Sequence, residues 1–176
     1  MKPLFGLFWQ ICVFRKGPDA VPYSTSLLGL LVIACLMFTA GLIYALDATY
    51  FQAKLLGGVL GLMGWMAMLF GLLSLKKASS RWVQTMSACL GTDLVMGVLV
   101  IPLQWLLLSG MQNGFTVLGQ IGLLMAMIWD ILIKARIYES AMSLDRFQAV
   151  VMSVFIWLTV WVVSLSFLPA EAFQQT

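Results

Sequence analysis

Three long stretches without a charged side chain constrain this fold more than any other feature. They lie between Asp19 and Asp47, between Lys54 and Lys76, and between Arg146 and Glu171. Each is long enough for a helix of about 20 residues, which crosses about 30 Å of hydrocarbon. The chain of 176 residues is 62% apolar and only 10% charged, whereas a soluble domain carries about 25% charged residues. We therefore expect an all-α integral membrane protein.

Two further spans lie between Arg81 and Lys134. This segment is longer than one span and contains Ser109–Gly114, a glycine- and asparagine-containing turn that reverses the chain. The five predicted spans are Thr25–Leu46, Lys54–Leu75, Val83–Leu108, Phe115–Lys134 and Phe147–Leu168. They form one transmembrane domain, 25–168, between an N-terminal segment, 1–24, and a short non-cytoplasmic tail, 169–176.

The positive residues predict the orientation, because cytoplasmic loops collect Lys and Arg. With a cytoplasmic N-terminus, nine of the ten Lys and Arg residues lie inside and only Lys54 lies outside. The C-terminus is then periplasmic, and the compact chain without long polar tails suggests a bacterial inner-membrane protein. The net charge of +3 indicates orientation and attraction to anionic lipid headgroups rather than nucleic-acid binding.

The N-terminal segment predicts an interfacial helix and an elbow. Pro3–Phe14 is almost wholly apolar but reaches only about 18 Å as a helix, so we expect an amphipathic helix lying at the cytoplasmic surface. In Arg15–Ser24, named the elbow here, two prolines prevent helix continuation. Its exposed polar residues serve either as a lipid anchor or as a docking surface for a protein partner. The candidate contacts in the elbow and the next cytoplasmic loop are Arg15, Lys16, Asp19, Lys76, Lys77 and Arg81.

Small residues and a proline predict helix packing. Gly57, Gly61 and Gly64 lie in the second span, where small residues let a neighbouring helix approach closely. The neighbour is another helix of the same chain or a second copy in a homo-oligomer. Pro102 in the third span predicts a kink or a carbonyl that neighbours must satisfy. Tyr138 falls where the aromatic belt of a membrane interface is expected.

Asp93 and Asp130 are the charges that orientation does not explain. They lie almost equally far from the Ser109–Gly114 turn along the sequence. Two straight antiparallel helices, rising about 1.5 Å per residue, bring them to the same depth, about 28 Å from the turn. Carboxylates within spans face the bundle interior or a wet cavity, and they are functional candidates by default.

Two arrangements of these carboxylates are open at this stage. If they face each other, one holds a proton, because close like charges disfavour ionisation of both. The pair then forms a proton or cation site that opens to the cytoplasm. Alternatively, each is neutralised separately: Asp130 pairs with Lys134 one turn along its own helix, and Asp93 is capped by Thr92 or by a partner helix.

The residue types present exclude several chemistries. The chain has no histidine, which excludes intramembrane hydrolases that use it as base or metal ligand. The three cysteines lie far apart, and the twelve methionines are scattered without a repeated cluster, so we interpret both as core residues rather than metal ligands. We therefore predict no catalytic residue, no metal site and no cofactor.

The topology resembles that of the YIP family, small five-span proteins named for binding Ypt/Rab GTPases in eukaryotes and widespread in bacterial inner membranes. The sequence Phe14-Arg15-Lys16-Gly17-Pro18, directly before the first span, is similar to the Arg- and Pro-containing approach of bacterial members. The resemblance implies five spans with a cytoplasmic N-terminal segment. It transfers no functional residue, and in a bacterial setting it does not transfer GTPase binding.

From the sequence we expect one of two functions. The first is a non-enzymatic scaffold or accessory subunit that contacts lipids and a protein partner through the elbow and the basic loops. The alternative is a small transporter or lipid-handling protein that uses Asp93 and Asp130 as a proton or cation site. A polar cavity that joins the two carboxylates distinguishes the alternative from the scaffold, for which a tightly packed bundle is expected.

Overall fold

Every regular element of the described residues is helical. The computed structural model describes residues 4–46, 48–108 and 115–167. The predicted turn at Ser109–Gly114 and the tail 169–176 therefore lie outside the described residues. The elements are α1 (Leu4–Cys12), η1 (Pro18–Ala20), α2 (Thr25–Leu46), α3 (Phe51–Leu75), η2 (Ser79–Arg81), α4 (Trp82–Leu108), α5 (Phe115–Met142) and α6 (Arg146–Leu165).

Five helices, α2 to α6, are long and apolar enough to cross a membrane. This confirms the predicted all-α class and is compatible with an integral membrane protein. The largest difference from the predicted bounds is in α5, which continues beyond Lys134 to Met142. The extension packs into the core through Ile137, Tyr138 and Met142, and its exposed side carries the ion pair of 2.9 Å between Arg136 and Glu139.

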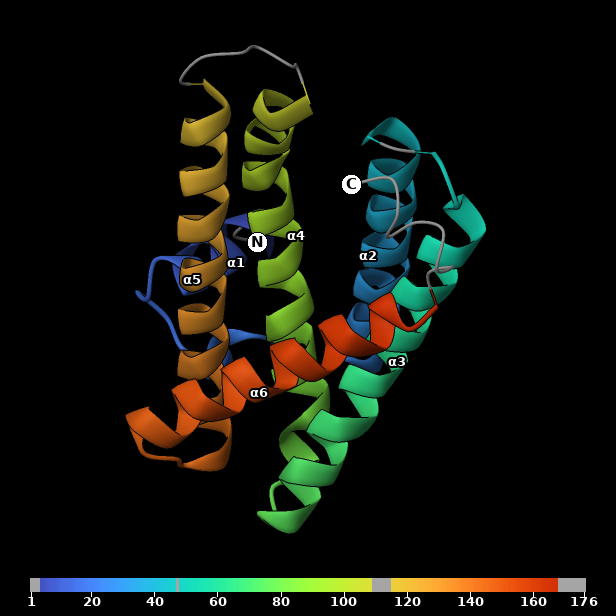
Figure 1. The fold of residues 1–176 in the computed structure, drawn as a ribbon. Coiled ribbons are helices and arrows are strands. Elements are labelled where there is room, and N and C mark those ends of the chain that lie inside the picture. Colours follow the sequence, from blue (N-terminus) through green and yellow to red (C-terminus); the bar gives the residue numbers. More distant parts are fainter. Residues whose placement is uncertain (1–3, 47, 109–114, 168–176) are drawn as a thin grey trace.

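The helices form two neighbouring pairs that α6 connects. Figure 1 shows α4 and α5 side by side, α2 and α3 as a second pair, and α6 crossing obliquely in front of them. α4 packs against α1, α2 and α5, while α6 packs against α3 and α5. Half of the apolar stretch of α4 is buried, the largest share among the five long helices. α4 is therefore the central helix of the bundle.

Glycines bring α3 close to α6. A Cβ added at Gly57 would lie 2.7 Å from the backbone oxygen of Ser164, and one added at Gly61 would lie 2.7 Å from the Ser164 hydroxyl oxygen. Only glycine permits this approach. The neighbour of the predicted small-residue face is thus a helix of the same chain.

Two other predicted packing features have different surroundings. Gly64 is exposed, and a Cβ added there meets no atom of the described residues within 4 Å. The prediction that Gly64 packs against a neighbouring helix is therefore wrong for the single chain, because α3 turns this position away from α6. Pro102 is exposed within α4, which continues through it to Leu108.

The tightest packing lies at one end of the bundle. We name this the elbow end, where α3 ends, α4 begins and α5 ends, and we name the opposite end of α4 and α5 the turn end. Side chains at most 1% exposed gather toward the elbow end, among them Leu69, Leu73, Met86, Ile137 and Tyr138. The assignment of Tyr138 to an interfacial belt is therefore wrong: its ring is enclosed between helices rather than at a lipid–water boundary.

The N-terminal segment packs against α4 and α5. The Phe8 ring lies so close to Gly91 that a Cβ there would overlap it, and the indole N–H of Trp129 donates to the Cys12 carbonyl at 3.0 Å. In the elbow, the Gln84 amide donates to the carbonyls of Asp19 at 3.2 Å and Val21 at 2.7 Å. α1 and the elbow are thereby held against the bundle, while the outer side of α1 stays apolar and exposed. The exposed α1 side chains are Leu4, Phe5 and Trp9.

Candidate functional site: an intramembrane ionic cluster

Asp93, Asp130 and Lys134 meet between α4 and α5, and we name these three residues the ionic cluster. The Lys134 ammonium lies 2.8 Å from an Asp93 carboxylate oxygen and also forms an ion pair and hydrogen bond with Asp130. The side chain of Lys134 is 12% exposed, that of Asp130 19% and that of Asp93 27%. One lysine thus bridges two largely buried carboxylates from neighbouring helices.

This arrangement combines the two that the sequence left open. Asp93 and Asp130 lie at the same depth, as the count from the turn predicts, and Asp130 also pairs with Lys134 along α5. Thr92 has a different role, because its hydroxyl donates to the Cys89 carbonyl at 2.8 Å. Its single O–H is therefore not available to cap Asp93, and Lys134 takes that place.

An aromatic pair supports the lysine from the side of α3. The Lys134 ammonium lies 5.4 Å from the centroid of the Trp65 ring, a distance at which the ring face attracts a cation. The Trp65 indole N–H donates to the Tyr138 hydroxyl oxygen at 3.0 Å. Trp65 was not among the residues predicted from the sequence, and Tyr138 was predicted only as part of an interfacial belt. The available signal was that a tryptophan N–H and a tyrosine O–H within apolar helices need hydrogen-bond partners when buried.

Three pockets meet at the ionic cluster, and Asp93 lines each of them. The cluster pocket, about 400 Å³, runs between α4 and α5 and is lined by all three residues of the cluster. The interhelix pocket, about 360 Å³, lies among α2, α3, α4 and α6. A smaller pocket of about 160 Å³ is lined by Asp93, Lys134 and Trp65, among others. The two carboxylates are thus joined by a cavity.

The pockets extend from the cluster toward the turn end. The cluster pocket continues along α4 as far as Gln104, and the interhelix pocket follows α2 from Cys35 to Leu42. On the other side of the cluster, Cys89 and Tyr138 are 0% exposed. Packed side chains therefore separate the cluster from the basic elbow end, toward which the sequence predicts an opening.

Two buried oxygen atoms, on residues that line the cluster pocket, have no hydrogen-bond partner among the described residues. They are Oδ1 of Asp130 and Oε1 of Gln104. A buried acceptor without a donor costs about 1–3 kcal/mol, and more when it is charged. A molecule or proton that supplies a donor to Asp130 would remove this cost, so the cluster pocket favours a bound group that carries N–H, O–H or positive charge.

The charge of the cluster also favours a cation. Two carboxylates and one ammonium leave one negative charge in excess, and a charge without a partner is costly in a medium of low dielectric constant. No three His, Cys, Asp or Glu side chains gather within the described ranges. The donors that the cluster offers to a cation are therefore its two carboxylates, which suit a proton or the positive group of an organic molecule.

The candidate surface residues divide into two groups. Arg15 and Lys16 line a pocket of about 570 Å³ with Arg136 and Glu139 from α5. Lys76 and Lys77 are exposed at the end of α3, outside that pocket.

Two other surface residues meet at Ser140 on α5. The Ser140 hydroxyl donates to the Asp19 carboxylate at 3.3 Å, and the Arg81 guanidinium donates to the Ser140 carbonyl at 3.4 Å. The elbow, the start of α4 and the end of α5 therefore form one polar surface at the elbow end.

No family model, no curated protein and no solved structure matches this chain.

Proposed function

We propose that this chain is a small membrane transporter or lipid-handling protein in which the ionic cluster binds a proton or the positive group of a ligand. The observation that carries the proposal is the cluster pocket, which joins Asp93, Asp130 and Lys134 in one cavity. The excess negative charge and the unpartnered Oδ1 of Asp130 support it. If Asp93, Asp130 and Lys134 served only to hold the helices together, the bundle would not need a pocket beside them.

Infrared spectroscopy of the protein in lipid nanodiscs tests the proton-binding part. As the pH falls from about 9 to about 4, we expect a carbonyl band of a protonated carboxylic acid that the variants D93N and D130N weaken or shift. D19N is the matched control, because Asp19 is an exposed carboxylate outside the cluster. Identical spectra for the wild type, D93N and D130N across this range would contradict the proposal.

A scaffold or accessory role is the second candidate, and the fixed elbow favours it. Hydrogen bonds from Gln84 and Ser140 hold the elbow at Asp19 and Val21, and Arg15 stays exposed beside it. A surface held in one conformation loses little entropy when a partner binds. Pull-down in mild detergent should recover a protein partner that the variant R15E/K16E loses. Repeated recovery of none counts against this role.

We also propose that the protein lies in a bacterial inner membrane with its N-terminus in the cytoplasm, and that it belongs to the YIP family. The Lys and Arg residues at the elbow end support the orientation, since cytoplasmic loops collect positive charge. Single cysteines placed at Lys77 and at Gln52 in a cysteine-free background test it. In intact cells, an impermeant thiol reagent should label only the cysteine at position 52, and the reverse result would invert the topology.

A further inference from the structure

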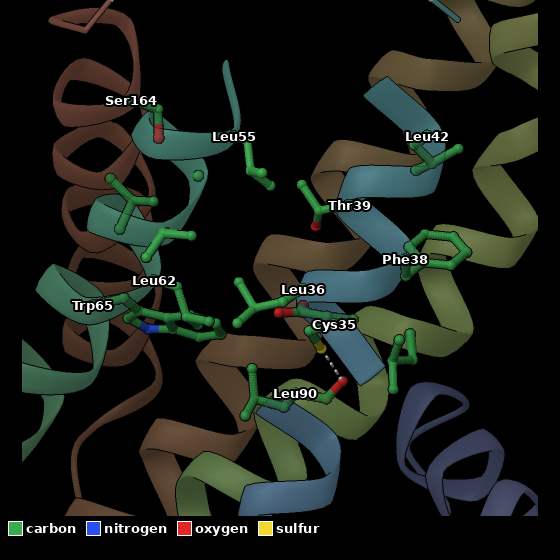
Figure 2. Close-up of a pocket in the computed structure, with 15 residues that line it drawn as sticks. Cys35, Leu36, Phe38, Thr39, Leu42, Leu55, Leu62, Trp65, Leu90 and Ser164 are labelled. Atoms are coloured by element: carbon green, nitrogen blue, oxygen red, sulfur yellow. Dashed lines mark hydrogen bonds between the residues drawn. The ribbon is translucent and has the colours of Figure 1, made fainter. Parts of the chain in front are cut away.

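The interhelix pocket is almost entirely apolar and is built by four helices. Figure 2 shows Leu36 and Thr39 of α2 facing Leu55 and Leu62 of α3 across it, with Ser164 of α6 beside them. The Cys35 thiol, which also lines it, donates to the Leu90 carbonyl at 3.6 Å. Its volume of about 360 Å³ falls in the range of about 300–1,000 Å³ typical of small-molecule sites.

Asp93 is the one charged residue among those that line this pocket. Its side chain is 27% exposed, so part of the side chain remains accessible beside its contact with Lys134. Lys134 does not line the pocket, and its ammonium is held by both carboxylates and the Trp65 ring. An anion that enters this pocket meets a carboxylate, whereas a cation meets the excess negative charge of the cluster.

We propose that the interhelix pocket binds a lipophilic organic cation, with its apolar body between α2 and α3 and its positive group against Asp93. This inference rests on the proposed function and names its ligand class. The apolar walls select a hydrophobic body, and Asp93 selects positive charge. A phospholipid is a poor fit, because its phosphate would lie beside the carboxylate.

A pair of ions with the same shape and opposite charge tests the charge preference. Tetraphenylphosphonium and tetraphenylborate are added to the full chain in lipid nanodiscs, and binding is measured by equilibrium dialysis with empty nanodiscs as the blank. We expect saturable binding of the phosphonium and none of the borate above the blank. Equal binding of both ions, or binding of neither, overturns the proposal.

Two glycine substitutions on α3 test the place of binding. A Cβ added at Gly58, which lines the pocket, would lie 3.6 Å from Thr39, an ordinary contact, whereas Gly64 faces away. The variant G58L fills the pocket and leaves every charge in place, and G64L carries the same substitution on the outer side. Phosphonium binding should be at least about tenfold weaker in G58L and unchanged in G64L. Equal binding by both variants overturns the assignment to this pocket.

The substitution D93N tests the charged contact. It should weaken phosphonium binding at least about tenfold, whereas D19N, which removes a carboxylate outside the cluster, should not. Unchanged binding by D93N overturns the proposal, and size-exclusion profiles confirm that each variant is folded. A protonated-acid band in the infrared titration without phosphonium binding would reject the ligand class alone. Loss of that band as well would reject the proposed function.

Discussion

The two halves of the bundle differ in how tightly their interiors are packed. In the packed half, toward the elbow end, Leu69, Leu73, Met86 and Tyr138 are 0% exposed. In the pocketed half, toward the turn end, the same helices line pockets of about 360 and 400 Å³ between them, whereas the pocket of about 570 Å³ at the elbow end lies between the elbow and α5. Lipid chains are as apolar as leucine, so composition does not drive helices together in a membrane. The difference therefore comes from the shapes of the side chains and from the polar groups between them.

The ionic cluster lies at the boundary between these halves. On one side Lys134 contacts the packed half through Trp65 and Tyr138, and on the other side both carboxylates line the cluster pocket. The packed half can therefore hold the cluster in place while the pocketed half admits a ligand. Four changes test this division, beginning with the one expected to have the largest effect.

Replacement of Lys134 by methionine should have the largest effect. It leaves two carboxylates facing each other with no cation, and removal of one partner from a buried ion pair typically costs about 3–5 kcal/mol. We expect a loss of this size in the free energy of unfolding, measured by titration with sodium dodecyl sulfate. The triple variant K134M/D93N/D130N should recover most of it. If K134M alone is as stable as the wild type, the cluster contributes nothing to holding the two halves together.

Truncation of a leucine should cost more in the packed half than in the pocketed half. Leu69 is 0% exposed, so L69A leaves a cavity that its neighbours cannot fill, at a cost of about 2–3 kcal/mol. L55A removes a side chain that already borders the interhelix pocket and should cost less than about 0.5 kcal/mol. The same unfolding titration compares them. Equal losses of unfolding free energy in L69A and L55A would show that side chains pack around Leu55 in solution and fill the pocket.

Adding a methyl group at a glycine of α3 tests which face of this helix contacts α6. In G57A the new Cβ meets the backbone oxygen of Ser164, and the forced shift should cost about 1–2 kcal/mol. In G64A the methyl group points into open space, and stability should be unchanged or slightly higher because alanine favours the helix. The reverse order in the unfolding titration would place the neighbour of α3 on its other face.

The fourth prediction concerns the reactivity of the Cys12 thiol. Burial, followed by the charges of Asp130 and Asp93, raises the pKa of Cys12 to about 11. Its thiolate fraction at neutral pH is then low, so in a variant with Cys12 as the single cysteine maleimide labelling should be slow and should rise with pH toward 11.

Substitution of two glycines of α4 allows the labelling rate of Cys12 to compare the two halves of the bundle. G91A pushes the Phe8 ring away from α4 and should speed labelling of Cys12 at pH 7, whereas G97A displaces the Phe38 ring beside the pockets and should not. Equal acceleration by both would mean that α1 does not depend on the packed half.

The sequence predicted the elements better than their contacts. Uncharged stretches locate α2, α3 and α6, and the Ser109–Gly114 turn separates α4 from α5 in the sequence. The fourth span is predicted to end at Lys134, whereas the helix α5 continues to Met142, and Lys134 has partners inside the bundle. Tyr138 lies in a charged stretch of α5, as an interfacial residue would, although its ring is buried. Gly64 was misplaced because spans such as α3 are apolar all round. Their sequences therefore do not show which face meets a neighbour.

The candidate site was predicted in part. Counting residues from the turn placed Asp93 and Asp130 at one depth, and the i, i+4 spacing paired Asp130 with Lys134. The count does not reveal helix rotation, so it left open that Lys134 reaches both carboxylates. Trp65 and the pockets depend on how α3 and α6 lie against α4 and α5. That arrangement is a property of the assembled bundle and not of any one span.

The docking of α1 has a consequence for the order in which the protein assembles. Phe8 lies against Gly91, and the Cys12 carbonyl accepts a hydrogen bond from Trp129, which is 117 residues later in the chain. During synthesis, which proceeds from the N-terminus at about 5–20 residues per second, α1 leaves the ribosome before either of these contacts exists. α1 must therefore wait at the membrane for α4 and α5, and it reaches its final place only after they have been made.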